Sequence, residues 1–445
     1  MSVVAIERVL RAEALELRGF SLDSPCTGYA GDTYALPLQG WALSETSPQV
    51  ALEAYVGDTC IARLPLAVRR SDIAELFSDV PWASNSGFSC SLNALRLPTE
   101  FSVDLRVSLR TGDSPQIATL RGRRERLAPN VDFTLNPILL TTLGRTGSTW
   151  LSHSLGQHPS IVTCEPFRYE ARISSYWMNI LVALSDEASY MQTLQGDLSG
   201  EHWWLGRGPA LPQDPLPVDE PLLRWWSRDH VRALIDFAFQ RIDDFYQFVA
   251  RDKPRGSGTP LFFLEKAGPN SITANLLLEA YESPKELLLV RDFRDMLASI
   301  LAYNRKWGYE GFGRDTVDTD AEYIDQLARD VRLLYERWAA RRNELLVVRY
   351  EDLILSPVTT LEEVFAYLDV DESAQTVEAV RLAASKSAEA AQVQHQTSRS
   401  QDQSVGRWCT DLTPELIDRS QRALGPYLDA FGYTTSREGS HASTA

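Results

Sequence analysis

The first part of the chain alternates between apolar and polar positions over short runs. Examples are VALEAYV (50–56), GFSCSLNAL (87–95) and FSVDLRVSLRTGD (101–113). A period of two is typical of half-buried β-strands, and turn residues separate the runs. We therefore predict a β-rich, sandwich-like domain over residues 1–128, with Trp41, Phe88 and Leu105 in its core and a short helix at 69–77.

Beyond residue 129 the pattern changes to nearly unbroken apolar runs, each followed by a helical period. These runs are NPILLTTLG (136–144), KELLLVR (285–291) and ELLVVRY (344–350). Strands buried on both faces that alternate with helices indicate an α/β fold with a doubly wound parallel sheet, which we place over residues 129–435. Because ligands of such sheets bind at the carboxyl ends of the strands, the loops at Arg145, Arg291 and Tyr350 form the candidate site.

Three segments bear on the domain organisation. The basic stretch RGRRERL (121–127) with the following Pro129 is interpreted as a linker, the alternative being a charged loop within one domain. Residues 185–262 form a helical insertion rich in tryptophan, whose rings either stack on an acceptor molecule or fill a helix core. The small and polar residues 436–445 are expected to form a disordered tail.

Charge and cysteine content exclude several classes of protein. The chain has 445 residues with 44 Lys and Arg against 60 Asp and Glu, a net charge of −16. This acidic balance argues against nucleic acid as a partner, although a local cationic pocket still allows an anionic ligand. The five scattered cysteines include no CxxC pair or Cys/His cluster, so a disulfide scaffold and a structural zinc site are disfavoured and we expect no metal.

The sequence also bears on location. Charged residues interrupt the apolar positions of the N-terminal segment, so it does not resemble a secretory signal. The run WMNILVAL (177–184) is far too short to span a bilayer. We therefore expect a cytoplasmic protein without a membrane span.

A glycine-containing loop, TLGRTGSTWL (142–151), lies between a predicted buried strand and a predicted helix. Gly144 and Gly147 allow a tight turn, and the helix that starts at Ser148 directs its first N–H groups and its dipole at one point. Arg145 adds a fixed positive charge that suits an anionic oxygen. The loop is not a Walker A motif, because no lysine precedes the hydroxyl residues, so an ATPase or kinase is weakly supported.

A second element, LLLVRDFRDMLASI (287–300), places Arg291 at a strand end and Ser299 eight residues later on the following helix. That spacing allows both side chains to converge on one phosphate. Arg294 with Asp292 and Asp295 is alternatively a surface ion-pair cluster of little energetic consequence.

Together, these two elements resemble the cosubstrate site of sulfotransferases that use 3′-phosphoadenosine-5′-phosphosulfate (PAPS). Four further segments resemble the family in order along the chain: HPSIVTCEPFR (158–168), FLEKAGPN (263–270), VRYEDLILSP (348–357) and SVGRW (404–408). The resemblance covers about residues 136–430 and implies a P-loop-like sulfotransferase fold. Small-phenol sulfotransferases carry lysine where this chain has Arg145, so the arginine-type loop favours the carbohydrate- and protein-modifying branch.

The resemblance also implies roles for individual residues. Those that would hold the 5′-phosphosulfate are Arg145, Thr146, Gly147, Ser148, Thr149 and Trp150. Arg291 and Ser299 would hold the 3′-phosphate, while Tyr350 and the 398–408 loop with Arg407 would lie near the nucleotide.

Sulfuryl transfer requires removal of the acceptor proton and stabilisation of charge on the leaving oxygen. Glu165 is the candidate base, the alternative being that it orders Arg168 or Arg145; His153 and His158 are rival bases. Lys266 and Arg145 are the candidates for stabilising the transition state, unless Lys266 pairs with Glu265.

We therefore predict an enzyme that transfers a sulfuryl group from PAPS, without a metal, to a hydroxyl-bearing acceptor, a carbohydrate or glycoconjugate in the first instance. A small metabolite, lipid or peptide hydroxyl is the alternative. A nucleotide-dependent kinase and a noncatalytic glycan-binding protein are further alternatives. The sequence leaves open a homodimer and the role of the β-rich domain.

Overall fold

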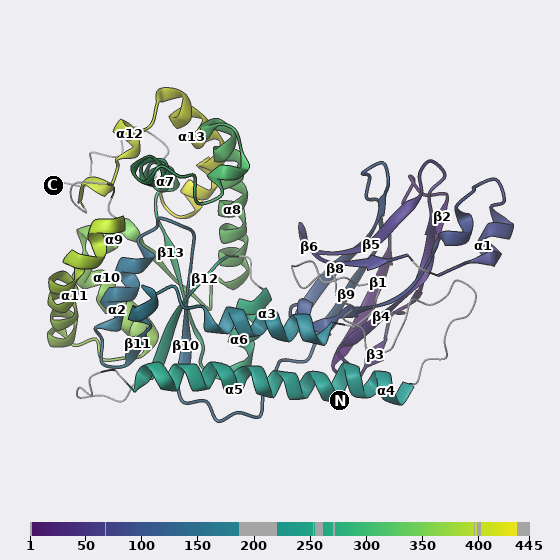
Figure 1. Cartoon of the computed structure of the whole chain (residues 1–445), viewed down its shortest axis with the longest axis horizontal. Helices are drawn as coiled ribbons and strands as arrows, with labels where there is room; N and C mark the ends of the chain where they lie inside the picture. Colours follow the sequence, from purple (N-terminus) through teal and green to yellow (C-terminus); the bar gives the residue numbers. More distant parts are fainter. Residues whose placement is uncertain are drawn as a thin grey trace. The chain divides into compact units, whose positions relative to one another are not determined.

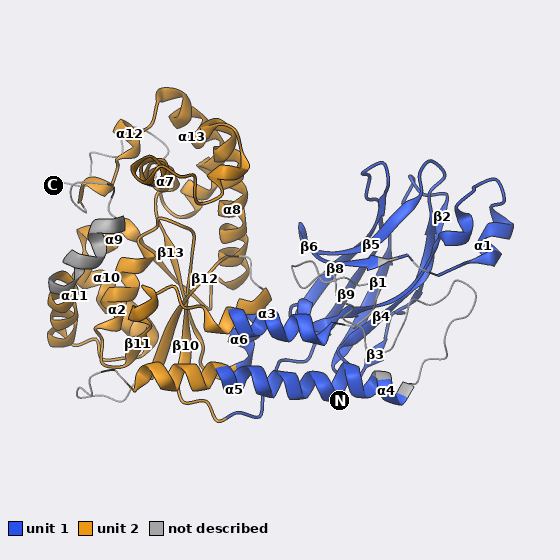
Figure 2. Cartoon of the chain, in the orientation of Figure 1, with its two compact units in different colours: residues 1–131, 176–241, 275–280 blue, residues 132–175, 242–274, 281–445 orange. Residues whose placement is uncertain are grey.

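The computed structural model describes residues 2–66, 68–186, 220–251, 253, 261–269, 272–395, 397 and 402–433. The chain forms two compact units that alternate along the sequence (Figures 1 and 2). Unit 1 comprises residues 1–131, 176–241 and 275–280, and unit 2 comprises residues 132–175, 242–274 and 281–445. The Trp203-Trp204 pair and the expected tail at 436–445 lie outside the described residues.

Unit 1 contains two antiparallel sheets. The larger has the strand order β3 (Ala30–Gly31), β1 (Val4–Arg11), β9 (Gln116–Arg124), β8 (Glu100–Leu109), β5 (Gln49–Val56) and β6 (Thr59–Pro65). The smaller has the order β2 (Gly19–Ser24), β4 (Ala35–Leu43) and β7 (Gly87–Asn93). The predicted β-rich N-terminal region is therefore confirmed.

Alternate residues of β8 are buried, as the period of two requires. Phe88 and Leu105 lie in the core as predicted, whereas Trp41 is only partly buried and packs against a small cluster around Ile73. The short helix expected at 69–77 is α1 (Ser71–Leu76).

Several helical segments begin in unit 1 or cross its boundary. They are α3 (Ile173–Ser185), α4 (Glu220–Arg224), a π-helical turn η4 (Trp225–His230), α5 (Val231–Ala250) and α6 (Ile272–Ala280). Three of them, α3, α5 and α6, contribute residues to both units. The units are thus built from interleaved segments of the chain.

Unit 2 contains one parallel sheet. Its strand order is β11 (Ile161–Thr163), β12 (Phe262–Ala267), β10 (Asn136–Thr142), β13 (Lys285–Val290) and β14 (Leu346–Arg349). After β10 the chain builds one side of the sheet and then the other, so the order reverses beside β10. Ligands of doubly wound sheets bind at such a point.

Helices cover both faces of this sheet. In chain order they are α2 (Ser148–Gly156), α7 (Phe293–Trp307), α8 (Asp320–Arg341), α9 (Tyr350–Leu355), α10 (Pro357–Leu368), α11 (Ala374–His395), α12 (Trp408–Asp411) and α13 (Pro414–Ala430). On β13, Leu288 and Val290 pack into one core cluster, while Leu287 and Leu289 pack into the other. Burial on both faces confirms the predicted α/β fold and explains the unbroken apolar run.

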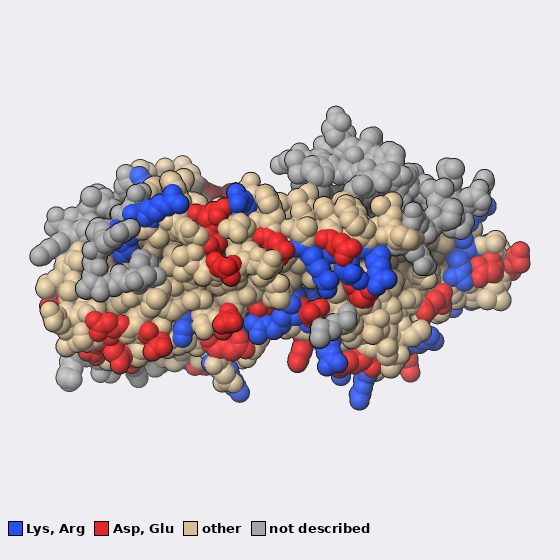
Figure 3. All heavy atoms as spheres, turned by 90° about the horizontal axis from the view of Figure 1, so that it is seen from below, with Lys and Arg blue, Asp and Glu red and all other residues tan. Residues whose placement is uncertain are grey.

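Two observations concern the surface. Basic and acidic side chains are interspersed on the face drawn in Figure 3. In the described part of the chain, no helix combines the length and the apolar character that crossing a bilayer requires.

Candidate functional site

A cavity of about 560 Å³ lies in unit 2 at the carboxyl end of the parallel sheet. Nine of the residues predicted to bind the cosubstrate line it: Arg145, Gly147, Ser148, Thr149, Trp150, Arg291, Ser299, Tyr350 and Arg407. They come from the loop after β10, from α2, from the β13–α7 connection, from α7 itself and from two later segments. The tertiary structure therefore brings together residues that span more than 260 positions of the sequence.

The loop between β10 and α2 turns through left-handed backbone. Arg145 has φ 65° and Gly147 has φ 93°. A Cβ atom at Gly147 would lie 2.4 Å from Cδ2 of Tyr350, so only glycine fits here. Thr146 does not line the cavity; its hydroxyl lies 2.6 Å from Thr142 Oγ1 and donates to the Leu143 carbonyl at 3.0 Å. That hydroxyl holds the turn closed, while the positive end of α2 borders the cavity.

Three arginines surround one part of the cavity. Arg291 donates through Nη1 to the Arg145 carbonyl at 3.1 Å and through Nη2 to the Ser404 carbonyl at 2.6 Å. Its Nε atom is buried and has no hydrogen-bond partner among the described residues. Arg145 Nε donates to Ser299 Oγ at 3.3 Å, and Arg407 donates to Thr397 Oγ1 at 2.7 Å.

Burial, together with the neighbouring charges of Arg291 and Arg407, lowers the pKa of Arg145 to about 10. Arg145 therefore lies buried near two further guanidinium groups, of which that of Arg407 also pairs with Asp411 at 2.6 Å. An anion bound in the cavity would relieve the repulsion among these groups.

Lys266, one residue before the end of β12, lies on the wall of the cavity with only 3% of its surface exposed. Its Nζ atom donates to Thr149 Oγ1 at 3.0 Å and to Glu170 Oε1 at 2.5 Å. The neighbouring Glu265 points the other way and accepts from Ser174 Oγ at 2.8 Å. The partner of Lys266 is therefore Glu170, a cavity residue that sequence reasoning missed although it follows Glu165 in the same loop.

The candidate bases differ in position. Glu165 does not line the cavity, and 64% of its side chain is exposed. His153 and Tyr169 both line it. His158 does not; it is buried, and its Nε2 lies 3.1 Å from the Asp371 carbonyl oxygen.

The segment that carries Arg407 is attached to α7. The Asp295 carboxylate accepts from the backbone N–H groups of Gly406 at 2.7 Å and Trp408 at 2.8 Å. Burial and the nearby Asp292 raise the pKa of Asp295 to about 7. Residues 398–401 of the predicted 398–408 loop lie outside the described residues.

The idea that Arg294 belongs to a surface cluster is wrong. Its side chain is buried, donates to both carboxylate oxygens of Asp292 at 3.0 and 2.7 Å, and stacks on Trp408. The cluster is thus part of the core beneath the site.

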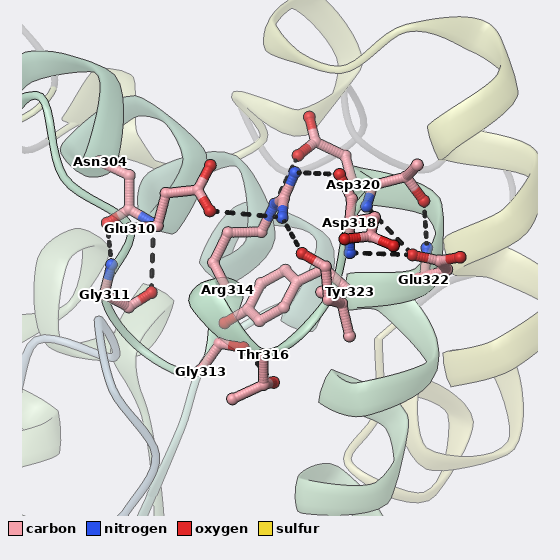
Figure 4. Close-up of polar contacts among 12 residues, drawn as sticks. Asn304, Glu310, Gly311, Gly313, Arg314, Thr316, Asp318, Asp320, Glu322 and Tyr323 are labelled. Carbon is pink, nitrogen blue, oxygen red and sulfur yellow. Dashed lines mark hydrogen bonds and ion pairs between the residues drawn. The ribbon is translucent and has the colours of Figure 1, made fainter.

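A loop after α7 borders the cavity through Phe312. A Cβ atom at Gly144 would lie 2.5 Å from Cδ1 of this ring. The loop is held by Arg314, which bonds Asp320 at 2.9 Å and the Val317 carbonyl at 2.7 Å (Figure 4). Tyr323 also donates to the Phe312 carbonyl at 2.7 Å.

No set of three or more His, Cys, Asp or Glu side chains within the described ranges is arranged to hold a metal ion. The charged groups that line the cavity are mainly arginine and lysine, which suit an anionic ligand rather than a cation.

Comparisons with known proteins bear on the identity of the fold. A family model described as "Sulfotransferase family" matches residues 137–374, which is more than half of the chain. No curated protein matches the sequence.

Solved structures with a similar fold include the sulfotransferase STF9 from Mycobacterium avium, which is 15% identical over 68% of this chain and 79% of its own, with a TM-score of 0.34. The sulfotransferase domain from the curacin biosynthetic pathway is 14% identical over 70% of this chain and 100% of its own, with a TM-score of 0.38. A mouse sulfotransferase complexed with PAP is 13% identical over 66% of this chain and 84% of its own, with a TM-score of 0.36.

Proposed function

The chain belongs to the sulfotransferase family, and from this premise we propose that it transfers the sulfuryl group of PAPS to an acceptor hydroxyl. The observation that carries the proposal is that Arg145, Arg291 and Arg407 line one cavity together with Ser299. The buried Nε of Arg291, which has no hydrogen-bond partner in the part of the chain that the structure describes, supports it, because a buried donor without a partner is costly unless a ligand satisfies it.

The residues fit a nucleotide that carries anionic groups at two positions. The N-terminus of α2, with Gly147, Ser148, Thr149 and Trp150, would hold the 5′-phosphosulfate through backbone N–H groups and hydroxyls. Arg291 and Ser299 would hold the 3′-phosphate. Tyr350 and Arg407 line the same cavity and would complete the nucleotide site.

PAPS supplies an activated sulfuryl group when it is bound. Lys266, fixed between Thr149 and Glu170, would place its ammonium beside the 5′ end of the site. Arg145 would add a second positive charge from the loop. Both would stabilise negative charge on the leaving oxygen, which is the main electrostatic demand of this reaction.

We also propose that the acceptor hydroxyl belongs to a carbohydrate or glycoconjugate. The support is Arg145, which stands where small-phenol sulfotransferases carry lysine. Small metabolites, lipids and peptides with a hydroxyl are the alternatives. Transfer of radiolabelled sulfate from PAPS to members of each class identifies the acceptor, and labelling of phenols alone would contradict the carbohydrate assignment.

Calorimetry with 3′-phosphoadenosine-5′-phosphate (PAP) tests the cosubstrate. Arg291→Ala should weaken PAP binding by about 10- to 100-fold, because a charge-assisted hydrogen bond contributes about 1.5–3 kcal/mol. Binding of AMP, which lacks the 3′-phosphate, should change little. Arg381→Ala, at an arginine on α11 whose side chain is 38% exposed, is the matched control.

Since Arg291 is buried, Ser299→Ala serves as a milder second variant, and thermal melting establishes that each variant is folded. Equal weakening of PAP and AMP would contradict the role of Arg291. Tighter binding of ATP than of PAP by the unaltered protein would favour a kinase and contradict the proposed function.

A further inference from the structure

Three side chains form a hydrogen-bonded row that leads from the protein surface to the cavity. Tyr169 OH lies 2.7 Å from His153 Nδ1 and donates to Glu165 Oε1 at 3.1 Å. Glu165 Oε1 itself is 3.9 Å from His153 Nδ1, too far for a direct hydrogen bond. Glu165 therefore reaches the imidazole through the tyrosine.

The order of donors in this row is set by the carboxylate. An ionised carboxylate only accepts hydrogen bonds, so the single hydroxyl proton of Tyr169 points to Glu165. Burial and Glu165 raise the pKa of Tyr169, which keeps this proton on the phenol. The phenolic oxygen then accepts from Nδ1–H of His153, and the basic lone pair of the neutral imidazole is on Nε2.

The backbone of the loop supports this arrangement. Arg168 and Tyr169 adopt consecutive left-handed conformations, with φ of 50° and 63°. Each costs roughly 1 kcal/mol or more for a residue with a side chain. Hydrogen bonds from Arg168 N to the Glu165 carbonyl and from Tyr169 N to the Cys164 carbonyl hold the turn, which returns the Tyr169 ring towards α2.

The inner end of the row borders the proposed reaction site. His153 lies four residues, or about one helical turn, after Thr149 on α2, so both side chains share one face of that helix. Both line the cavity, and Thr149 contacts Lys266. An acceptor hydroxyl bound beside the 5′ end of the nucleotide site would therefore contact His153, which lines the cavity, rather than Glu165, which does not.

We propose that His153 is the general base and that Tyr169 and Glu165 are positioning residues that fix its tautomer. This inference rests on the proposed function. As the bond from the acceptor oxygen to sulfur forms, the acceptor O–H bond breaks and its proton passes to Nε2 of His153. The bond from sulfur to the bridging oxygen breaks, and its electron pair leaves with PAP. The row to Glu165 then stabilises the imidazolium.

Nitrogen-15 NMR of the full-length protein labelled at its six histidines tests the tautomer without any turnover, with His153→Asn assigning the signal. The neutral ring of His153 should carry its proton on Nδ1. Glu165→Gln should move the proton to Nε2. The new amide N–H group donates to the Tyr169 oxygen, so the Tyr169 hydroxyl donates instead to Nδ1 of His153. A proton on Nε2 in the unaltered protein would overturn the proposal.

Turnover with the acceptor found in the radiolabel screen separates this relay from direct catalysis by Glu165. Tyr169→Phe keeps the Glu165 carboxylate but removes the hydroxyl that connects it to His153. We therefore expect this variant to lose as much activity as Glu165→Gln and His153→Asn. In all three, kcat should fall by roughly 100-fold or more, as for loss of a general base. PAP affinity should stay within about 2-fold. Tyr176→Phe, an exposed tyrosine, and Glu363→Gln, an exposed glutamate, are matched controls.

Full turnover in Tyr169→Phe with loss in Glu165→Gln would show that Glu165 acts directly and would contradict the relay. Failure of the unaltered protein to bind PAP would instead contradict the proposed function, and the NMR measurement would still report the tautomer. The two failures are therefore distinguishable.

Discussion

Neighbouring residues on β12 have opposite environments because side chains alternate along a strand. Lys266 faces the cavity, while Glu265 is buried on the other side and hydrogen-bonded to Ser174. Burial raises the pKa of Glu265 to about 7 and outweighs the hydrogen bonds that lower it. Position on the strand, rather than residue type, decides which of the two takes part in the proposed chemistry.

At the residue scale, Glu265→Gln should remove one source of the pH dependence of the protein's stability. The folded-state pKa of about 7 lies above the ordinary value of 4.5, so the folded protein retains the proton that the unfolded chain loses. The contribution of this group to stability is full below pH 4.5 and is lost as the pH rises through 7. Glutamine does not titrate, so the free energy of unfolding of the variant relative to the unaltered protein should rise by about 3 kcal/mol between pH 4.5 and 8.

Urea denaturation at several pH values measures this difference. Glu363→Gln, on the exposed side of α10, should show no such trend. A difference between Glu265→Gln and the unaltered protein that stays constant with pH would contradict a proton held by Glu265.

At the scale of elements, the cavity is bounded by loops that polar side chains hold in place. Arg314 crosslinks its own loop to the start of α8 through Asp320 (Figure 4). The same loop carries Phe312 to the cavity. Helix α8 starts with a capping box of Thr319 and Glu322, which fixes the point where the loop ends. The segment with Arg407 is fixed in a comparable way by Asp295.

Arg314→Ala should therefore loosen the loop more than it destabilises the protein. We expect faster hydrogen exchange at residues 309–317 and a loss of about 1–3 kcal/mol in stability, because the Val317 and Asp318 carbonyls and the Asp320 carboxylate lose their partner. PAP affinity should fall by several-fold through Phe312. Hydrogen exchange followed by mass spectrometry measures this, with Arg329→Ala on the exposed side of α8 as the control; equal exchange in both variants would contradict the role of Arg314.

At the scale of the whole molecule, the charge of the cavity differs in sign from the net charge of the chain. The chain carries a net charge of −16, and opposite charges are interspersed on the face in Figure 3, whereas the cavity gathers three arginines and Lys266. Salt screens charges that are exposed to solvent but leaves those in a cavity partly unscreened. The protein should therefore select a small anion and reject a polyanion.

We expect PAP binding to weaken by roughly tenfold between 50 and 500 mM salt while remaining saturable, since charge attraction contributes only part of the affinity. Random duplex DNA should not bind at 100 mM salt. Calorimetry measures PAP binding, and a gel-shift assay measures DNA binding. Adenosine, which carries no phosphate, is the control whose binding should not depend on salt. Binding of DNA at the same concentration as PAP would contradict this distribution of charge.

The sequence by itself determined the features that depend on neighbours in the chain. Local backbone conformation and burial pattern made three elements predictable. They are the alternating strand at 101–109, the apolar strand at 285–290 and the tight turn at Gly147. The spacing of Arg291 and Ser299 is likewise local, because one strand end and one helix fix it. The same locality made the family resemblance visible.

Only the tertiary structure decided which side chains meet. Glu170 rather than Glu265 contacts Lys266, and Tyr169 stands between Glu165 and His153, because partners are set by loops that fold back in space. The interleaving of the two units has the same origin: α3, α5 and α6 look like ordinary helices in sequence, and long-range packing assigns their halves to different units. Periodicity specifies the face that a residue presents, whereas its partner depends on distant elements that pack against that face.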